Sequence, residues 1–191
     1  MAQPLPLPRL YTVAEYLALG ETEPGYSELV EGRMIVNPGP SPDHNLAGLG
    51  LALALRQQVP ADLVVIPDLD VDLELARPDK PGFVRRPDVV VAQRTGLKRV
   101  RAEGGAIRAS EVVLVIEVVS PSSVRTDNVI KRAEYADAGI PHYWIVDLSE
   151  PASVLVCHLA GEFGYVDGGW VTGVFGVSDP FRAEIDLNSL Q

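Results

Sequence analysis

"VVLVIEVVSPSS", residues 112–123, decides the fold because it combines a short buried strand with one charged residue inside it. Residues 112–119 are mostly β-branched, and Ser120 and Pro121 end the run, which is typical of a short buried strand. Glu117 interrupts the apolar pattern. An ionised carboxylate inside a protein needs a cation, a metal or hydrogen-bond donors beside it. The stretch therefore predicts a buried strand and partners for Glu117 elsewhere in the chain.

The size and composition of the chain predict a single domain. It has 191 residues, of which 47% are hydrophobic, which is enough for one core over residues 1–191 and short for two. Cys157 has no second cysteine to pair with, which fits a reducing compartment. The first residues lack a signal-peptide pattern, and the longest apolar run, 46–55, is shorter than the roughly 20 residues that span a bilayer. We therefore expect a cytoplasmic protein without a membrane segment.

The remaining patterns predict an α+β protein. A helix with a Thr12–Glu15 capping box, closed by Gly20, precedes a hairpin, and a helix beginning at Ser41 and Pro42 follows it. A central mixed or antiparallel sheet flanked by helices, with extra C-terminal hairpins, accommodates this order. The predicted segments are a hairpin at 27–37, strands at 63–75, 85–92, 112–119 and 141–147, a basic loop at 94–108, and a helix from about 126 to 139.

Acidic residues alternate with apolar ones between residues 68 and 75, which predicts a half-buried strand. Four carboxylates in a row could indicate a metal site, but no other ligand converges on them, so a solvated sheet face is the preferred interpretation.

Charge is distributed unevenly along the chain. The formal net charge of −10 argues against a nucleic-acid partner, because such binding depends on neutralising phosphates. Between residues 85 and 108, however, seven basic residues face only two acidic ones. This segment is either a surface for phosphates or a solvated loop. Its candidate nucleic-acid contacts are Arg85, Arg86, Lys98, Arg99 and Arg101.

Three residues form a candidate metal site around Glu117. Asp88 opens one strand, Glu117 lies toward the end of another, and Lys131 lies on the next helix, so the three can meet at one end of a sheet. Two carboxylates with water suit Mg²⁺ or Mn²⁺. Such an ion can activate water for attack on a phosphodiester, and the lysine can position that water, deprotonate it or stabilise the transition state.

Each feature also has a simpler explanation when it is taken alone. Asp88 could be a turn residue after Pro87, and Lys131 could form an exposed pair with Asp127. Tyr135 is more simply a core residue, and His44 a residue of a helix end.

The segments "RRPDVVV", "LVIEVVSPSS" and "DNVIKRAEYADAGIPHYWIVD", with the earlier "YSELVEGRMIV", resemble the Uma-type putative restriction endonuclease family of the PD-(D/E)XK nuclease superfamily. The resemblance covers about residues 10–150. It implies a restriction-endonuclease-like core, DNA as substrate and frequent homodimers. It further implies that Asp88 and Glu117 are metal ligands, that Lys131 is the catalytic lysine and that Glu28 is an accessory acid.

One position departs from the superfamily motif. Val119 stands two residues after Glu117, where the (D/E)XK lysine belongs, and the resemblance implies that Lys131 replaces it from the following helix. Two functions therefore remain open. The chain is either a Mg²⁺- or Mn²⁺-dependent endonuclease acting on DNA, or an inactive nuclease-fold module that binds nucleic acid or a protein partner.

Overall fold

The order of helices and strands follows the predicted mixture of both. The structure is a computed structural model, and it describes residues 9–20, 26–121 and 123–190. Its helices are α1 (Val13–Leu17), α2 (Pro42–Arg56), α3 (Arg94–Glu103), the π-helix η2 (Thr126–Lys131) and α4 (Arg132–Asp137), with short 3₁₀ turns at Ala109–Glu111, Gly161–Phe163 and Leu187–Leu190. Its strands are β1 (Tyr26–Val30), β2 (Arg33–Asn37), β3 (Leu63–Pro67), β4 (Val71–Asp72), β5 (Val84–Arg85), β6 (Val89–Gln93), β7 (Ile107–Arg108), β8 (Val112–Val119), β9 (His142–Asp147), β10 (Ser153–Leu159), β11 (Tyr165–Thr172), β12 (Val174–Val177) and β13 (Ala183–Asp186).

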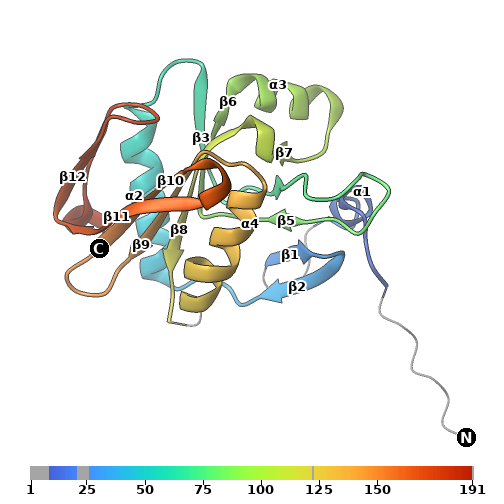
Figure 1. The fold of residues 1–191 in the computed structure, drawn as a ribbon, viewed down its shortest axis with the longest axis horizontal. Helices are drawn as coiled ribbons and strands as arrows, with labels where there is room; N and C mark the ends of the chain where they lie inside the picture. Colours follow the sequence, from blue (N-terminus) through green and yellow to red (C-terminus); the bar gives the residue numbers. More distant parts are fainter. Residues whose placement is uncertain (1–8, 21–25, 122, 191) are drawn as a thin grey trace, which may run out of the picture.

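A six-stranded sheet forms the centre, in the order β11-β10-β9-β8-β6-β3. Strand β8 pairs antiparallel with β6 and parallel with β9, so the sheet is mixed, as expected. Helices α2 and α4 lie on opposite faces of this sheet (Figure 1). The stretch at residues 112–119 is therefore covered on both sides, which explains its nearly continuous apolar sequence.

The two faces of the sheet explain where the site carboxylates point. Leu114 and Ile116 of β8 pack into the core on the α2 side, whereas Val115 packs on the α4 side. Side chains of a strand alternate between faces, so Glu117 shares the α4 side with Val115. Asp88, two residues before Val90, is brought to that same face.

A second sheet packs beside the first and carries further site residues. Its order is β2-β1-β5-β4-β7. The hairpin β1–β2 turns at Glu31 and Gly32, which have φ angles of 50° and 75°, as a tight two-residue turn requires. The C-terminal hairpin β12–β13 packs Phe175 and Ile185 into the core on the α2 side. The predicted helix starts at Thr12 and Ser41 and the predicted C-terminal hairpins are confirmed.

The single strand predicted for residues 63–75 is wrong. The chain forms β3 and β4, which belong to different sheets, and Asp68 between them has a φ of 50°. Asp tolerates this left-handed conformation better than most residues. The alternating pattern identified which side chains share a face, but it carried no information about where the backbone turns. One of the four acids, Asp70, pairs with Arg86 instead of facing solvent alone.

The basic loop predicted for residues 94–108 is also wrong over most of its length, because residues 94–103 form helix α3. Gly96 lowers the helix propensity of this segment, which hid the helix in the sequence. The glycine is required because a Cβ there would lie 2.9 Å from the carboxylate carbon of Glu111. Gly104, with a φ of 78°, ends the helix.

The helix predicted after Glu117 is confirmed. It begins near Thr126, contains the π-helix η2 and continues as α4 until Gly139, whose φ is 73°. A π-helical turn widens the backbone and is often found at functional sites. Here it contains Asp127 and Lys131, and both are buried.

Candidate active site

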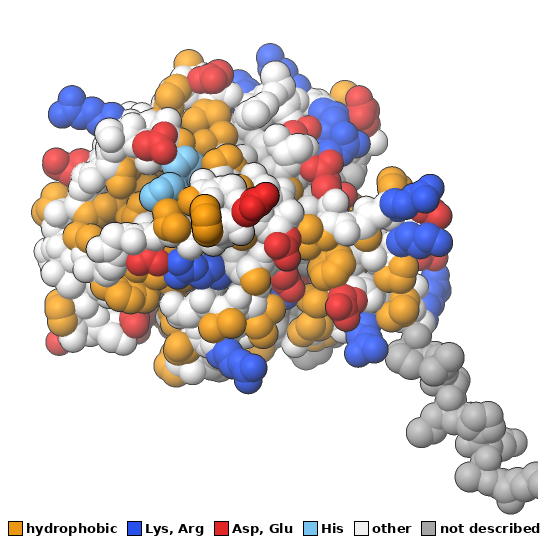
Figure 2. Space-filling view, in the orientation of Figure 1, with side chains coloured by type: hydrophobic (Ala, Val, Ile, Leu, Met, Phe, Trp, Pro, Cys, Tyr) orange, Lys and Arg blue, Asp and Glu red, His pale blue; other side chains and the backbone are white. Residues whose placement is uncertain are grey.

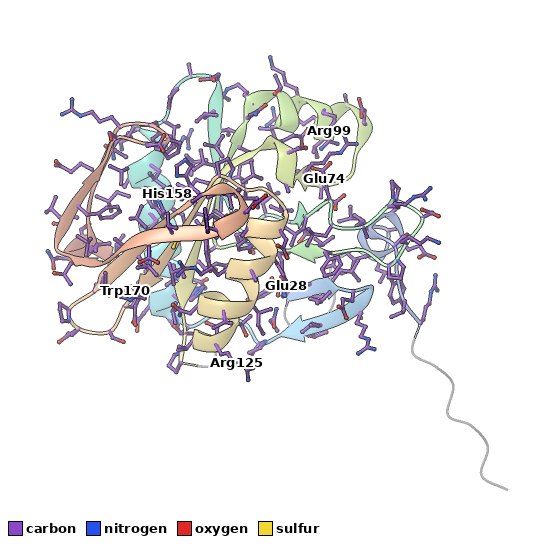
Figure 3. The ribbon with its side chains drawn as sticks, viewed as in Figure 1. Glu28, Glu74, Arg99, Arg125, His158 and Trp170 are labelled. Carbon is purple, nitrogen blue, oxygen red and sulfur yellow. The ribbon has the colours of Figure 1, made fainter. Side chains whose placement is uncertain are left out.

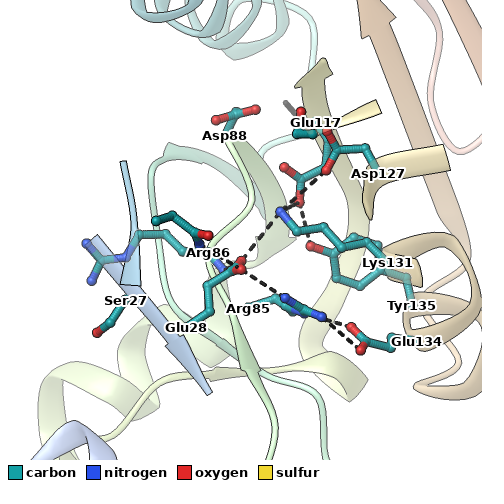
Figure 4. Close-up of polar contacts among 12 residues, drawn as sticks. Ser27, Glu28, Arg85, Arg86, Asp88, Glu117, Asp127, Lys131, Glu134 and Tyr135 are labelled. Atoms are coloured by element: carbon teal, nitrogen blue, oxygen red, sulfur yellow. Dashed lines mark hydrogen bonds and ion pairs between the residues drawn. The ribbon is translucent and has the colours of Figure 1, made fainter. Parts of the chain in front are cut away.

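Asp88 and Glu117 lie side by side on neighbouring strands. Val89 pairs with Ile116 in the antiparallel ladder, so Asp88, one residue earlier, lies opposite Glu117, one residue later. Oδ2 of Asp88 accepts a hydrogen bond of 2.6 Å from the backbone N–H of Val118. This bond fixes the Asp88 carboxylate against the end of β8, next to Glu117 (Figure 4).

Lys131 meets these carboxylates from the helix that follows β8. Its Nζ lies 2.9 Å from Oε1 of Glu117, 3.4 Å from Oε1 of Glu28 and 3.7 Å from Oδ1 of Asp127 (Figure 4). The hydroxyl of Tyr135 donates a second hydrogen bond to Oε1 of Glu117, at 2.6 Å. Glu117, the exception in an apolar strand, thus has one cation and one neutral donor as partners.

A second set of charges holds this arrangement in place. Arg85 donates two hydrogen bonds to Glu134 of α4, at 2.6 and 2.8 Å, and one of 2.9 Å to Oε2 of Glu28. Arg85 is only 3% exposed. Oε1 of Glu28 accepts from the backbone N–H of Arg86 and lies near Lys131. The second sheet and helix α4 are therefore joined through buried charge pairs around the candidate site.

The site opens into a cavity of about 410 Å³. Glu28, Asp88, Glu117, Asp127 and Lys131 line it, together with residues 37–41 and the segment 118–126 that connects β8 to the helix. His44 of α2 also lines the cavity, with Nε2 3.3 Å from Oδ2 of Asp88. Four carboxylates thus surround one lysine and one histidine, so the cavity has a strong excess of acidic groups.

Burial and the neighbouring acids determine how the groups titrate. Burial raises the pKa of Glu117 to about 8; the carboxylates of Asp88, Asp127 and Glu28 add to this rise, and Lys131 opposes it. For Lys131, burial acts to lower the pKa, but Glu117, Glu28 and Asp127 outweigh it, and the pKa lies above its ordinary value. Lys131 therefore stays protonated at neutral pH. An additional cation beside Glu117 would stabilise the ionised carboxylate.

The carboxylates of this site fit a hard divalent cation. In the described part of the chain, both partners of Glu117 use Oε1, and both partners of Asp88 use Oδ2. Each carboxylate therefore has one oxygen that no described side chain or backbone group engages, and both residues line the cavity. Oxygen donors and an excess of negative charge are what Mg²⁺ and Mn²⁺ prefer. Among the described residues, no cluster of three or more His, Cys, Asp or Glu side chains is arranged as a preformed metal site, so water would complete the coordination.

The basic residues proposed from the sequence as nucleic-acid contacts occupy different environments. Arg85 is buried in its ion pairs, and Arg86 and Arg99 pair with Asp70 and Glu111. Lys98 and Arg101 are exposed on α3. Asp88 precedes β6 and α3 follows it, so these two residues lie at the opposite end of the strand from the cavity. Figure 3 shows Arg99 beside α3, well apart from Glu28, and Figure 2 shows acidic and basic side chains mixed on the same face.

Several members of the site were undervalued in the sequence. His44 and Tyr135 could be explained by a helix end and by the core, yet both contact a site carboxylate. Asp127 was interpreted as part of an exposed pair, but it is buried beside Lys131. The four-residue spacing of 127, 131 and 135 was the available signal, because it places all three on one face of a helix.

A mixed sheet that brings two carboxylates and a lysine together at one end of neighbouring strands defines a restriction-endonuclease-like fold. The family model described as Uma2, putative restriction endonuclease, matches residues 13–170. The chain therefore belongs to this family.

A solved structure supports the same fold. The chain is similar to a putative nuclease belonging to DUF820 from Anabaena variabilis ATCC 29413, with a TM-score of 0.68 and 19% identity over 94% of this chain and 97% of that one. A search of curated proteins finds no significant match. Among the described residues, no helix is both long and apolar enough to cross a membrane.

Proposed function

We propose that the protein is a Mg²⁺- or Mn²⁺-dependent endonuclease that hydrolyses phosphodiester bonds in DNA. The observation that carries the proposal is the meeting of Asp88, Glu117 and Lys131 in one cavity, with an unengaged oxygen on each carboxylate. Membership of a restriction endonuclease family supports the reaction class. The family resemblance also supports a homodimer, which sedimentation analysis would test.

In this proposal Asp88 and Glu117 hold the metal ion. The bound ion would supply Lewis acidity at the phosphate and lower the pKa of a water molecule. Lys131 has a raised pKa, so it acts as a cation that stabilises negative charge on the phosphate and not as a proton acceptor. Glu28 does not need to touch the substrate: it holds the Lys131 ammonium group from the side of β1.

The position of the lysine supports its proposed role. Val119 replaces the lysine of the superfamily motif, but Lys131 brings its ammonium group to 2.9 Å from Glu117 from a different element. A lysine that enters from the helix can serve the same carboxylate pair, because the chemistry depends on the position of the charge and not on its place in the sequence.

A non-catalytic binding module is the second candidate. It is favoured by the environment of Lys131, whose ammonium group lies within 4.0 Å of three carboxylates in the absence of any ligand. In such a module the lysine would serve only to neutralise buried acids, and the net charge of −10 would limit DNA binding.

Calorimetric titration with Mn²⁺ distinguishes the two candidates when it is combined with a cleavage assay. We expect Asp88→Asn and Glu117→Gln to abolish Mn²⁺ binding and DNA cleavage, and Lys131→Met to abolish cleavage while binding persists. Asp79→Asn, at an exposed residue away from the cavity, is the control. Mn²⁺ binding that survives both carboxylate variants would refute the site. Binding without cleavage of any DNA by the wild type would favour the module.

A further inference from the structure

A second, smaller cavity adjoins the candidate active site. Its volume is about 160 Å³, and it shares Tyr26, Pro40, His44 and Asp88 with the lining of the larger cavity. A group that enters the second cavity therefore lies directly beside the acid cluster. None of the site chemistry described above uses this space.

The second cavity exists because a glycine stands on the inner face of α2. Gly48 lies one helical turn from both His44 and Ala52, and it is buried. A Cβ built on Gly48 would meet no atom within 4 Å outside the helix's own nearby backbone. Most buried helix faces are filled by side chains at close-packed density, so an unfilled position next to a site indicates room for a ligand.

The lining of the second cavity combines flat surfaces with a few polar groups. Tyr26, Pro40 and Pro67 supply ring surfaces, and the amide of Asn45 and the guanidinium of Arg86 supply polar groups at its border. Arg86 is held in place by Asp70, at 2.8 and 3.1 Å. Aromatic faces with hydrogen-bonding groups at their edges are how proteins bind unstacked nucleobases.

The size of the cavity limits what can enter. At about 160 Å³ it is smaller than the roughly 300 Å³ at which pockets for drug-sized ligands begin, so it suits one ring system and not a whole nucleotide or a helix edge. A base inside a duplex is stacked and paired, and it must leave the stack to enter a pocket of this kind.

We propose that the second cavity receives the nucleobase next to the phosphodiester that is cut, so that the substrate is single-stranded or locally unpaired nucleic acid. This inference rests on the proposed function, because the phosphate position is defined by the acid cluster. Tyr26 provides the ring on which the base stacks, and the border groups contact its edge. Gly48 keeps the cavity open.

The test fills the cavity without disturbing the metal site. The Gly48→Leu variant places a side chain in the empty space, and Tyr26→Leu removes the ring while it keeps an apolar side chain. Leu53→Phe adds bulk on an exposed position of the same helix, outside both cavities, and is the matched control. Melting temperature and Mn²⁺ titration establish that each variant is folded and keeps its metal site.

Fluorescence anisotropy then measures binding of a short labelled single-stranded oligonucleotide and of the matching duplex, with Ca²⁺ replacing Mg²⁺. We expect the wild type to prefer the single strand, and Gly48→Leu and Tyr26→Leu each to weaken its binding by about tenfold, as expected for the loss of one stacked base. Leu53→Phe should bind like the wild type.

Equal single-strand binding by the folded Gly48→Leu variant and the wild type would overturn the inference, and so would a preference for the duplex. Neither result would affect the proposed function if the wild type still cuts DNA with Mn²⁺. Conversely, Gly48-dependent binding without any cleavage would support the second cavity and refute the nuclease proposal.

Discussion

Arg85 and Glu134 form a two-point ion pair, at 2.6 and 2.8 Å, that connects strand β5 to helix α4. Glu134 lies three residues after Lys131, so the pair fixes the part of the helix that presents the lysine. Arg85 also donates to Glu28, which in turn lies 3.4 Å from Lys131. The position of the candidate catalytic lysine is therefore set by a buried arginine on another sheet.

Removing this arginine should strongly destabilise the protein. Arg85→Ala leaves two carboxylates without their buried cation, and breaking a buried charge pair in this way costs about 3–5 kcal/mol. Urea unfolding followed by circular dichroism measures the change. Arg9→Ala, which breaks the exposed Arg9–Glu15 pair, should leave the unfolding free energy near the wild-type value. Similar effects of the two substitutions would show that the Arg85 pairs add little to stability.

The raised pKa of Glu117 predicts that the metal-free protein loses stability as pH rises. Between pH 4.5 and about 8 the folded state retains a proton on Glu117 that the unfolded chain releases. The folded state then binds more protons than the unfolded state, so the unfolding free energy falls with pH, by at most about 1.4 kcal/mol per pH unit for one group. His44, whose pKa is also raised, contributes in the same direction above pH 6.5.

Melting temperatures in EDTA between pH 5.5 and 8 test this prediction. The wild-type melting temperature should fall across the range, and the Glu117→Gln variant, which lacks the titrating group, should show a shallower dependence. Mn²⁺ should stabilise the wild type most at the upper end of the range, because it competes with the proton for Glu117. A wild-type melting temperature that is constant or rises with pH would contradict the assignment.

Two glycines allow the same substitution to be tested with opposite expected signs. A Cβ at Gly48 or at Gly139 would meet no atom within 4 Å, so neither substitution by alanine causes a clash. Gly48 lies inside α2, where alanine is favoured over glycine by about 1 kcal/mol. Gly139 has a φ of 73°, a left-handed conformation that costs alanine about 1–2 kcal/mol.

Thermal or urea unfolding should therefore show a gain for Gly48→Ala and a loss for Gly139→Ala. A loss for Gly48→Ala would mean that the space beside it is filled in solution, which would also weaken the case for the second cavity. A neutral Gly139→Ala would mean that the end of the helix rearranges readily.

The sequence contained enough information for the central sheet and for the two metal-ligand candidates. The apolar run around Glu117 predicted β8, and Pro87 and Asp88 marked the beginning of β6, so their pairing brought the carboxylates together. Lys131 could be placed by helical periodicity from the end of the same strand. These predictions succeeded because they depend on local patterns whose spacing is fixed by the geometry of strands and helices.

The remaining features depend on contacts between distant segments. The turn at Asp68 and the helix containing Gly96 were missed because their causes, a change of sheet and a close approach to Glu111, are tertiary. Arg85 appeared to be one of several surface cations, because its partners Glu28 and Glu134 lie 57 and 49 residues away in the chain. The empty space beside Gly48 likewise has no local signature.

Lys98 and Arg101 provide the last prediction, because they are the two members of the proposed nucleic-acid contacts that are exposed and form no ion pair in the described part of the chain. They lie at the far end of β6 from the cavity, about 17 Å away at 3.3 Å per strand residue. A short oligonucleotide bound in the cavity should not need them, whereas a long DNA that extends over α3 should.

Neutralising both residues should therefore affect long DNA selectively. For Lys98→Ala/Arg101→Ala we expect unchanged binding of a short oligonucleotide, weaker binding of long DNA, and a decrease of about 2 in the slope of log affinity against log salt, since each phosphate contact contributes about 0.9. Arg77→Ala/Lys80→Ala, which removes two exposed cations elsewhere, is the control. If the two double variants reduce the slope equally, α3 makes no specific contribution; if neither does, DNA reaches the cavity without crossing α3, and the positive charge of this helix serves only to solvate it and to pair Arg99 with Glu111.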